Sequence, residues 1–173
     1  MADAVVIRSF AETDAPAVRE LFIRINRLLA PPAMKNAFEA YIASAIAEEI
    51  GRIDAYYSDH NGYFWVAEDD GRLAGMFGLE TTAGGDAMEL RRMYVDPDLR
   101  RRGIARIMLA FAESECRRRG FKRLELSTSE VQAAALSLYR NSGYRLDREE
   151  LAAAASNKTV GGGIRRFYFS KAL

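Results

Sequence analysis

Apolar positions fall into separate blocks along the chain, some with helical spacing and some with the spacing of strands. A β-branched run predicts a first strand at residues 4–9. Apolar residues three and four positions apart then predict one helix from about residue 13 and, after Pro31 and Pro32, a second helix ending near Gly51. From residue 63 the pattern becomes extended and predicts strands at 63–68 and 73–82 around a DDGR turn, and a third strand at 88–95.

The second half of the chain continues this alternation. The pattern predicts a helix at 103–119, a strand at 121–127, a short helix from a Ser129/Gln132 capping box to about residue 141, and closing strands at 144–148 and 164–170. Small residues connect the closing strands, and we predict that this connection is mobile. The predicted order is βααβββαβαββ. It indicates one α/β domain over residues 1–173, a mixed sheet flanked by helices.

Composition and charge narrow the function classes. Apolar residues make up 49% and charged residues 28% of the 173 positions, as in ordinary globular domains, so a disordered or fibrous chain is not expected. The net charge of +1 provides no overall field to attract nucleic acid or an anionic membrane. One cysteine, Cys116, and one histidine, His60, cannot form a thiolate cluster or a histidine-rich site, so we expect no metal.

The start of the chain and its hydropathy bear on location. The first ten residues lack a basic segment followed by an apolar one, and no run of 18 apolar residues occurs. We therefore expect a cytoplasmic protein that does not bind membranes.

Basic residues gather in one part of the chain. Residues 100–123 hold nine basic and two acidic side chains, a local net charge of +7, which leaves −6 for the remainder. The first part of this segment is a loop that runs into a predicted helix. Unpaired backbone N–H groups at a helix start attract anions, so the pattern predicts a pyrophosphate-sized anion site. A solvated basic loop without a ligand is the alternative interpretation.

Two motifs resemble those of a known family. The segment RRRGIA at residues 100–105 matches the pattern Q/R-x-x-G-x-G/A between a strand and a helix, and ALSLYRNSGY at 135–144 matches A-x-x-L-Y-x-x-x-G-F/Y. With these motifs and the predicted element order, the chain resembles the GNAT superfamily of N-acetyltransferases. The resemblance implies the GNAT fold and transfer of an acetyl group from acetyl-CoA directly to an amine, through a ternary complex.

The resemblance also assigns residues to the acyl donor. Backbone amides of the loop would bind the pyrophosphate, and the preceding strand would pair with the thioester and pantetheine. Gln132 stands where the family often has asparagine, and it is expected either to touch the pantetheine or only to cap its helix. The residues so assigned to acetyl-CoA are Met93, Tyr94, Val95, Arg100, Arg101, Arg102, Gly103, Ile104, Ala105, Arg106 and Gln132.

Acetyl transfer needs a group that removes a proton from the amine and one that stabilises the leaving sulfur. Glu89 is the leading candidate for the base, acting through water, with Glu80 in reserve; the alternative role for Glu89 is an ion pair with an arginine. Tyr139 faces the sulfur if the resemblance holds, and otherwise packs in the core. Because a phenol ordinarily has a higher pKa than a thiol, full proton transfer from Tyr139 to the thiolate is uphill by about 2 kcal/mol, so a hydrogen bond is its expected role.

Several other residues keep two interpretations. Cys116 is expected to be a packed thiol rather than an acetyl carrier, and His60 a loop residue rather than part of the acceptor site. Arg91 or Arg92 could clamp an acceptor carboxylate, but an ion pair is the favoured role.

The acceptor itself is weakly specified. We expect its pocket to draw on the two N-terminal helices, the strands around Glu80 and Glu89, and the connection at 152–163. A small-molecule amine or amino-acid derivative is preferred over a protein or peptide amine, because no extended acidic run would hold a basic peptide. A non-catalytic acyl-CoA sensor is the rival function, nucleic-acid binding is a weaker alternative, and a homodimer is left open.

Overall fold

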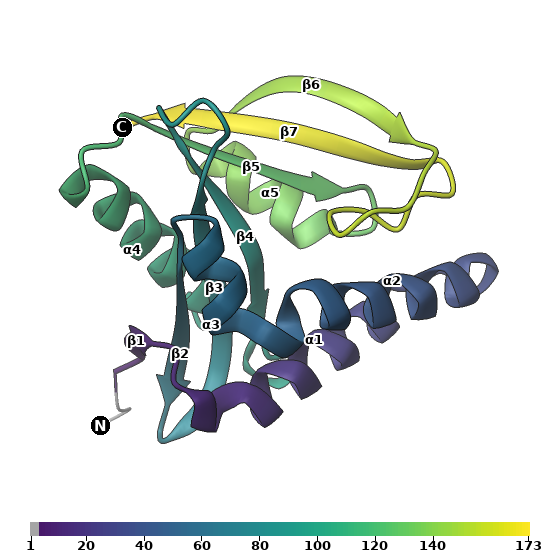
Figure 1. Ribbon diagram of the computed structural model, residues 1–173, viewed down its shortest axis with the longest axis horizontal. Helices are drawn as coiled ribbons and strands as arrows, with labels where there is room; N and C mark the ends of the chain where they lie inside the picture. Colours follow the sequence, from purple (N-terminus) through teal and green to yellow (C-terminus); the bar gives the residue numbers. More distant parts are fainter. Residues whose placement is uncertain (1–3) are drawn as a thin grey trace.

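The computed structural model describes residues 4–173, which form one mixed sheet of seven strands in the order β1-β2-β3-β4-β5-β7-β6 (Figure 1). All neighbouring strands pair antiparallel except β4 and β5, which are parallel. The strands are β1 (Val6–Ser9), β2 (Tyr63–Asp69), β3 (Arg72–Thr81), β4 (Met88–Val95), β5 (Arg123–Ser129), β6 (Arg145–Ala152) and β7 (Ile164–Ala172).

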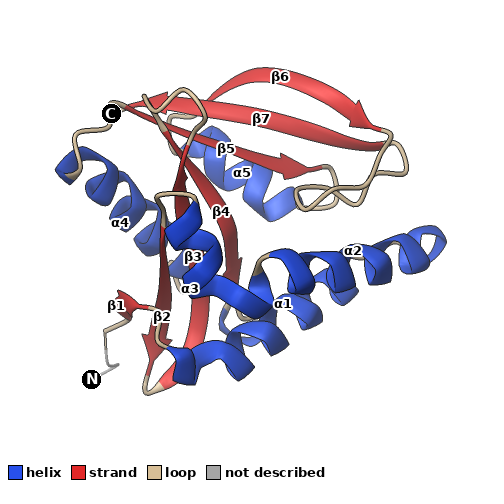
Figure 2. Cartoon of the chain, in the orientation of Figure 1, coloured by secondary structure: helices blue, strands red, loops and turns tan. Residues whose placement is uncertain are grey.

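Helices cover both faces of the sheet (Figure 2). Side chains of β2 alternate between the faces: Phe64 and Val66 pack with the first three helices, whereas Trp65 and Ala67 pack with the fourth. This double burial explains why β2 and β3 read as continuous apolar runs. The helices are α1 (Ala15–Leu29), α2 (Lys35–Glu48), α3 (Ile53–Asp59), α4 (Ile104–Arg118) and α5 (Ala133–Asn141), with short 3-10 turns at Glu12–Asp14, Pro32–Met34, Ile50–Arg52 and Pro97–Leu99.

The predicted α/β class and mixed sheet are confirmed, and the element order differs by one helix. The sequence pattern ends the second helix near Gly51 and predicts no element before residue 63, whereas α3 occupies Ile53–Asp59. Its buried residues Ile53, Tyr56 and Tyr57 do have helical spacing. Seven residues are too few for that signal to stand out, and the observed order is βαααβββαβαββ.

The centre of the sheet opens because β4 and β5 separate. Their parallel pairing extends only from Met88 opposite Leu124 to Leu90 opposite Leu126, yet β4 continues to Val95 and β5 to Ser129. Figure 1 shows the two strands diverging, with β5, β6 and β7 running across the direction of β2, β3 and β4. The space between the separated ends is where a ligand can enter the sheet.

A β-bulge lies on β4 at this point of separation. Gly78 of β3 pairs with Arg91 and Met76 pairs with Tyr94, so two residues of β4 oppose one residue of β3. Arg92 within the bulge has a φ of 54°, a left-handed conformation that is uncommon for a residue with a side chain. The bulge bends β4 away from β5.

Candidate active site

A cavity of about 90 Å³ lies where β4 and β5 separate. It is lined by residues of α1, α2, most of β4, the end of β5, the turn before α5, α5 itself, the loop between β6 and β7, and the start of β7. Its lining residues are Asn26, Leu29, Phe38, Tyr41, Glu89, Leu90, Arg91, Arg92, Met93, Tyr94, Ser127, Thr128, Ser129, Val131, Gln132, Tyr139, Asn157, Lys158, Thr159, Val160, Ile164 and Arg166.

The predicted site residues divide into two groups in space. The cavity is lined together by Glu89, Met93, Tyr94, Gln132 and Tyr139, although they come from β4, from the residue before α5 and from α5 itself. The residues predicted to hold the phosphates do not line it. Val95 ends β4, and residues 100–106 form the loop and first turn of α4 beyond the edge of the cavity.

The start of α4 has the geometry of an anion-binding loop. Gly103 precedes the helix with a φ of 76°, and the first helical hydrogen bond runs from Ile107 N to Gly103 O over 3.1 Å. The N–H groups of Ile104, Ala105 and Arg106 therefore have no acceptor within the helix. Arg101, with a φ of 63°, adds a second left-handed residue, and such turns present adjacent N–H groups on one side.

One arginine of this loop is already paired. The guanidinium of Arg102 forms an ion pair with Asp69 at the end of β2. This contact ties the loop to the β2–β3 hairpin. The ion pair largely neutralises the charge of Arg102. The cations of the loop that remain for a phosphate are therefore the exposed Arg100, Arg101 and Arg106.

Tyr139 is 5% exposed and lies on α5 against Tyr144 and Phe169, with ring centroids 5.8 and 6.0 Å away. The ring thus packs in the core while the residue also lines the cavity, so core packing leaves Tyr139 beside the space open to a ligand. Burial, with a smaller contribution from Tyr94, raises the pKa of Tyr139 above its ordinary value. The phenol stays protonated, which suits a hydrogen-bond donor and disfavours release of its proton.

Gln132 stands at the N-cap position of the short helix α5, but its side chain makes no capping hydrogen bond to that helix. Its Oε1 accepts hydrogen bonds from Thr128 Oγ1 at 2.7 Å and from the backbone N of Ser129 at 3.3 Å. Because β5 extends to Ser129 and α5 begins only at Ala133, the predicted capping box that would start the helix at Ser129 does not form. The contacts hold Gln132 against the end of β5, and the residue lines the cavity.

Glu89 meets two cations at one end of the cavity. Lys158 Nζ, from the loop between β6 and β7, lies 2.7 and 3.1 Å from its two carboxylate oxygens, and Arg91 Nη1 lies 3.6 Å away. The arginine ion pair expected as an alternative is therefore present, and the lysine was not anticipated. Glu80, the reserve base, does not line the cavity and accepts a hydrogen bond of 2.8 Å from Tyr56 Oη.

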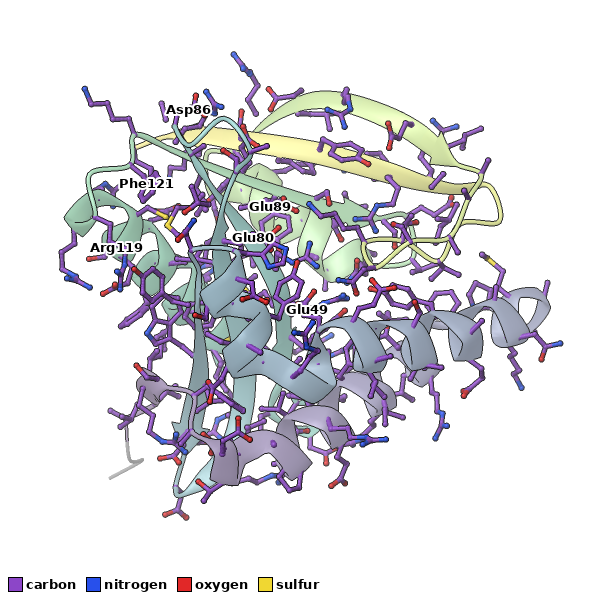
Figure 3. All side chains as sticks on the ribbon, viewed as in Figure 1. Glu49, Glu80, Asp86, Glu89, Arg119 and Phe121 are labelled. Atoms are coloured by element: carbon purple, nitrogen blue, oxygen red, sulfur yellow. The ribbon has the colours of Figure 1, made fainter. Side chains whose placement is uncertain are left out.

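A further glutamate, Glu49, lies beneath the cavity and was not found by the sequence analysis. It follows α2 directly and is completely buried. Arg92 Nε donates to Glu49 Oε2 at 3.0 Å, Arg91 forms an ion pair with Oε1, and Tyr57 Oη donates to Oε2 at 2.8 Å. Figure 3 shows Glu49, Glu80 and Glu89 gathered at the centre of the molecule.

The electrostatics of this cluster keep Glu49 ionised. Burial alone would raise the pKa of its carboxyl, but the charges and hydrogen bonds of Arg92 and Arg91 outweigh burial and lower the pKa to about 2. Both arginines are at least nine-tenths buried and line the cavity. The preferred interpretation of Arg91 and Arg92 as ion-pair residues is correct, although their shared partner comes from the helical layer.

The predicted mobile connection is fixed at its centre by the same cluster. Asn157 Nδ2 donates to Glu49 Oε1 at 2.9 Å, and Arg92 Nη2 donates to the backbone O of Asn157 at 2.6 Å. The connection thus forms one wall of the cavity. Its small-residue composition hid this anchoring, because asparagine is also common in free turns.

The remaining candidates lie outside the cavity. Cys116 is fully buried on α4, and burial together with Glu113 and Glu115 raises its pKa to about 12, so it is a packed thiol rather than a nucleophile. His60 ends α3, stacks on the ring of Tyr56 at 4.0 Å and does not contribute to the cavity.

The family can be assigned from comparison with known proteins. Residues 22–144 match the Acetyltransferase (GNAT) family, and this match covers both motifs and most of the sheet. The chain belongs to this GNAT family. Its fold matches the PaiA N-acetyltransferase of Thermoplasma acidophilum in complex with coenzyme A, with a TM-score of 0.76 and 19% identity over 99% of this chain and 100% of that one.

Two further proteins extend the comparison. The YncA acetyltransferase structure from Salmonella typhimurium, which contains acetyl-CoA, has a TM-score of 0.73 and 16% identity over 98% of this chain and 94% of that one. N-acetylaspartate synthetase from Danio rerio is 31% identical over 107 residues, 61% of this GNAT chain. The chain spans 38% of the length of that relative. Within residues 4–173, no helix is both long and apolar enough to cross a membrane.

Proposed function

We propose that this GNAT chain is an N-acetyltransferase that moves the acetyl group of acetyl-CoA directly onto the amine of a small molecule or amino-acid derivative. The observation that carries the proposal is the cavity between β4 and β5. It is lined by Glu89 and by Tyr139, and the anion-binding start of α4 follows β4 in the chain. Family membership and the CoA-containing structures of similar fold support acetyl-CoA as the donor.

The donor would be held along β4. Its pyrophosphate would accept hydrogen bonds from the free N–H groups of residues 104–106, and Gly103 lets a phosphate approach the backbone closely. Because β4 and β5 no longer pair beyond Leu90, the β4 backbone around Met93 and Val95 can pair with the pantetheine arm instead. The thioester would then lie in the cavity beside Tyr139.

The chemistry needs one proton removed and one negative charge stabilised. We assign the base to Glu89, which lines the cavity, rather than to Glu80, which does not. The acceptor ammonium loses a proton to Glu89 through water, and the neutral nitrogen attacks the carbonyl carbon to form a tetrahedral intermediate. The C–S bond then breaks, the nitrogen loses its second proton to solvent, and the thiolate takes a proton from solvent. Tyr139, protonated because of its raised pKa, donates a hydrogen bond to the sulfur as its charge develops.

Three observations bear on the acceptor and the route. Arg166 lines the cavity, donates to Ser127 Oγ at 2.7 Å and has no carboxylate partner among the described residues. It suits an acceptor carrying a carboxylate, whereas the other three cations of the lining are already paired with Glu49 or Glu89. N-acetylaspartate synthetase, the relative from Danio rerio, is named for the N-acetyl derivative of an amino acid. The buried thiol of Cys116 supports direct transfer, because it offers no acetyl-carrying nucleophile.

Thiol release from acetyl-CoA, measured across a panel of amines and amino acids, tests this function. The proposal expects release that depends on the acceptor, with the N-acetyl product identified by mass spectrometry. A non-catalytic sensor would bind acetyl-CoA, by calorimetry, and release no thiol with any acceptor.

A further inference from the structure

A primary amine of the chain itself occupies the base end of the cavity. Lys158 Nζ contacts both carboxylate oxygens of Glu89, at 2.7 and 3.1 Å, and lies 3.7 Å from Glu80 Oε1. These are the two carboxylates considered for deprotonation of the acceptor. The lysine therefore stands where the amine of an acceptor is expected, within the same cavity as Tyr139.

The loop around Lys158 is anchored on both sides of the lysine. Asn157, the preceding residue, is held by hydrogen bonds to Glu49 and Arg92, which places Lys158 over the cavity. Three glycines follow at 161–163, with φ values of 74°, 66° and 83°. Glycine makes these conformations accessible without strain, and the turn is held by hydrogen bonds from Gly162 N to Ala153 O at 3.1 Å and from Gly163 N to Ala152 O at 2.9 Å. The backbone therefore keeps Lys158 at the cavity, and its flexible side chain supplies the reach toward the thioester.

The composition makes this lysine distinctive. Four of the 25 basic residues are lysines and the rest are arginines. An arginine has no neutral amine to acetylate, because its guanidinium stays protonated in proteins. Among the described lysines, Lys158 alone lines the cavity; Lys35 and Lys122 are exposed elsewhere, and Lys171 donates to Glu113 at 2.9 Å.

We propose that Lys158 is acetylated in cis by acetyl-CoA bound to the same chain; the inference rests on the proposed function. The ammonium gives a proton to Glu89, and the neutral nitrogen attacks the thioester carbonyl carbon. The C–N bond forms and the C–S bond breaks. Tyr139 donates a hydrogen bond to the departing thiolate, which takes a proton from solvent. Glu89 passes the proton it received to solvent, and the nitrogen loses its second proton to solvent as the amide forms. One net proton is therefore released for each acetyl group transferred.

Acetylation changes the charge of the cavity. The amide of acetyl-Lys158 carries no positive charge and cannot form the ion pairs with Glu89 and Glu80. Glu89 in the cavity and Glu80 beside it would then keep Arg91 as their remaining cationic neighbour, at 3.6 Å from Glu89 and 3.5 Å from Glu80. The modification would thereby remove the internal amine from the acceptor position.

The experiment is a time course of the full chain with acetyl-CoA and no added acceptor. Occupancy of each lysine is measured by peptide mass spectrometry after trypsin digestion, which acetylation blocks at the modified residue. We expect Lys158 to be acetylated at least about tenfold faster than Lys35 and Lys122, and at a first-order rate that does not change with protein concentration. Glu89→Gln should slow Lys158 by about a hundredfold, within the range for loss of a general base, and leave Lys35 and Lys122 unchanged.

Two results would overturn the inference. One is equal acetylation of Lys158, Lys35 and Lys122, which indicates spontaneous chemistry; the other is a Lys158 rate unaffected in both Glu89→Gln and Tyr139→Phe. Circular dichroism checks that both variants are folded. Thiol release with external amines but without Lys158 acetylation would contradict this inference and leave the proposed function standing, whereas loss of both would contradict the function as well.

Discussion

The carboxylate of Glu49, directly after α2, accepts a hydrogen bond of 3.0 Å from Arg92, the residue at which β4 bends away from β5. Arg92 has a φ of 54°, which costs about 1–3 kcal/mol for a residue with a side chain. The buried ion pair offsets this cost and holds the bulge. A helix on one face of the sheet thus fixes the opening between two central strands, and the cavity owes its shape to that contact.

Glu49→Gln should destabilise the protein. Removing the carboxylate charge leaves the guanidinium groups of Arg91 and Arg92 buried with less compensation, and such changes cost about 3–5 kcal/mol. Glu48→Gln is the matched control because Glu48 is the preceding residue and is exposed. Urea denaturation followed by circular dichroism measures both. Equal midpoints for the two variants would contradict the role given to Glu49.

Glu49 also predicts the direction of the acid response. Its pKa falls from 4.5 to about 2 on folding, so the native state binds fewer protons than the unfolded state in this range. The contribution to the free energy of unfolding, about 3 kcal/mol, is complete above pH 5 and is lost as the pH falls toward 2. Unfolding measured between pH 2 and 6 should therefore show a shallower pH dependence in Glu49→Gln than in the wild type.

Gly103 and Gly120 allow a paired test of the phosphate loop. Each flanks α4 with a positive φ, 76° and 85°, and a Cβ at either position would meet nothing within 4 Å. Replacing either glycine by alanine should introduce a similar backbone strain and lower the free energy of unfolding by about 1–2 kcal/mol. Only Gly103→Ala should weaken coenzyme A binding, by about tenfold in calorimetry, equivalent to about 1.4 kcal/mol. Equal affinities in the two variants would remove Gly103 from the proposed site.

The assignment of the base can be tested by comparing two carboxylates. Glu89→Gln should lower kcat for amine acetylation by about a hundredfold, because Glu89 lines the cavity. Glu80→Gln should lower kcat less, because Glu80 lies outside the cavity, where its carboxylate accepts a hydrogen bond from Tyr56. Steady-state kinetics and the pH dependence of kcat distinguish the two. The reverse order would transfer the role to Glu80.

The sequence predicts those parts of the fold whose signals are local. The strand Met88–Val95 has its predicted bounds because Asp96 and Pro97 end it, and α4 lies between two glycines that mark its start and end. The class of the fold and the residues of the two motifs follow from such local patterns. The short helix α3 is missed because seven residues give too little periodicity.

The buried cluster of Glu49, Arg91 and Arg92 could not be predicted from local patterns. Glu49 is 42 and 43 positions from Arg91 and Arg92, and Lys158 is 69 positions from Glu89. No pattern of spacing links residues so far apart. The bulge could not be predicted either, because the residue with the positive φ is Arg92 and not a glycine, which would have indicated a bulge in the sequence.

The most direct test of the account is thiol release from acetyl-CoA by the wild type and by Tyr139→Phe, with the acceptor that the amine panel identifies. The account predicts acceptor-dependent release by the wild type, and a kcat lower by about a hundredfold in Tyr139→Phe with unchanged affinity for coenzyme A. Tyr63→Phe, at an exposed tyrosine outside the cavity, is the control. Equal kcat values for the wild type and Tyr139→Phe would contradict the assignment of this cavity as the site of acetyl transfer.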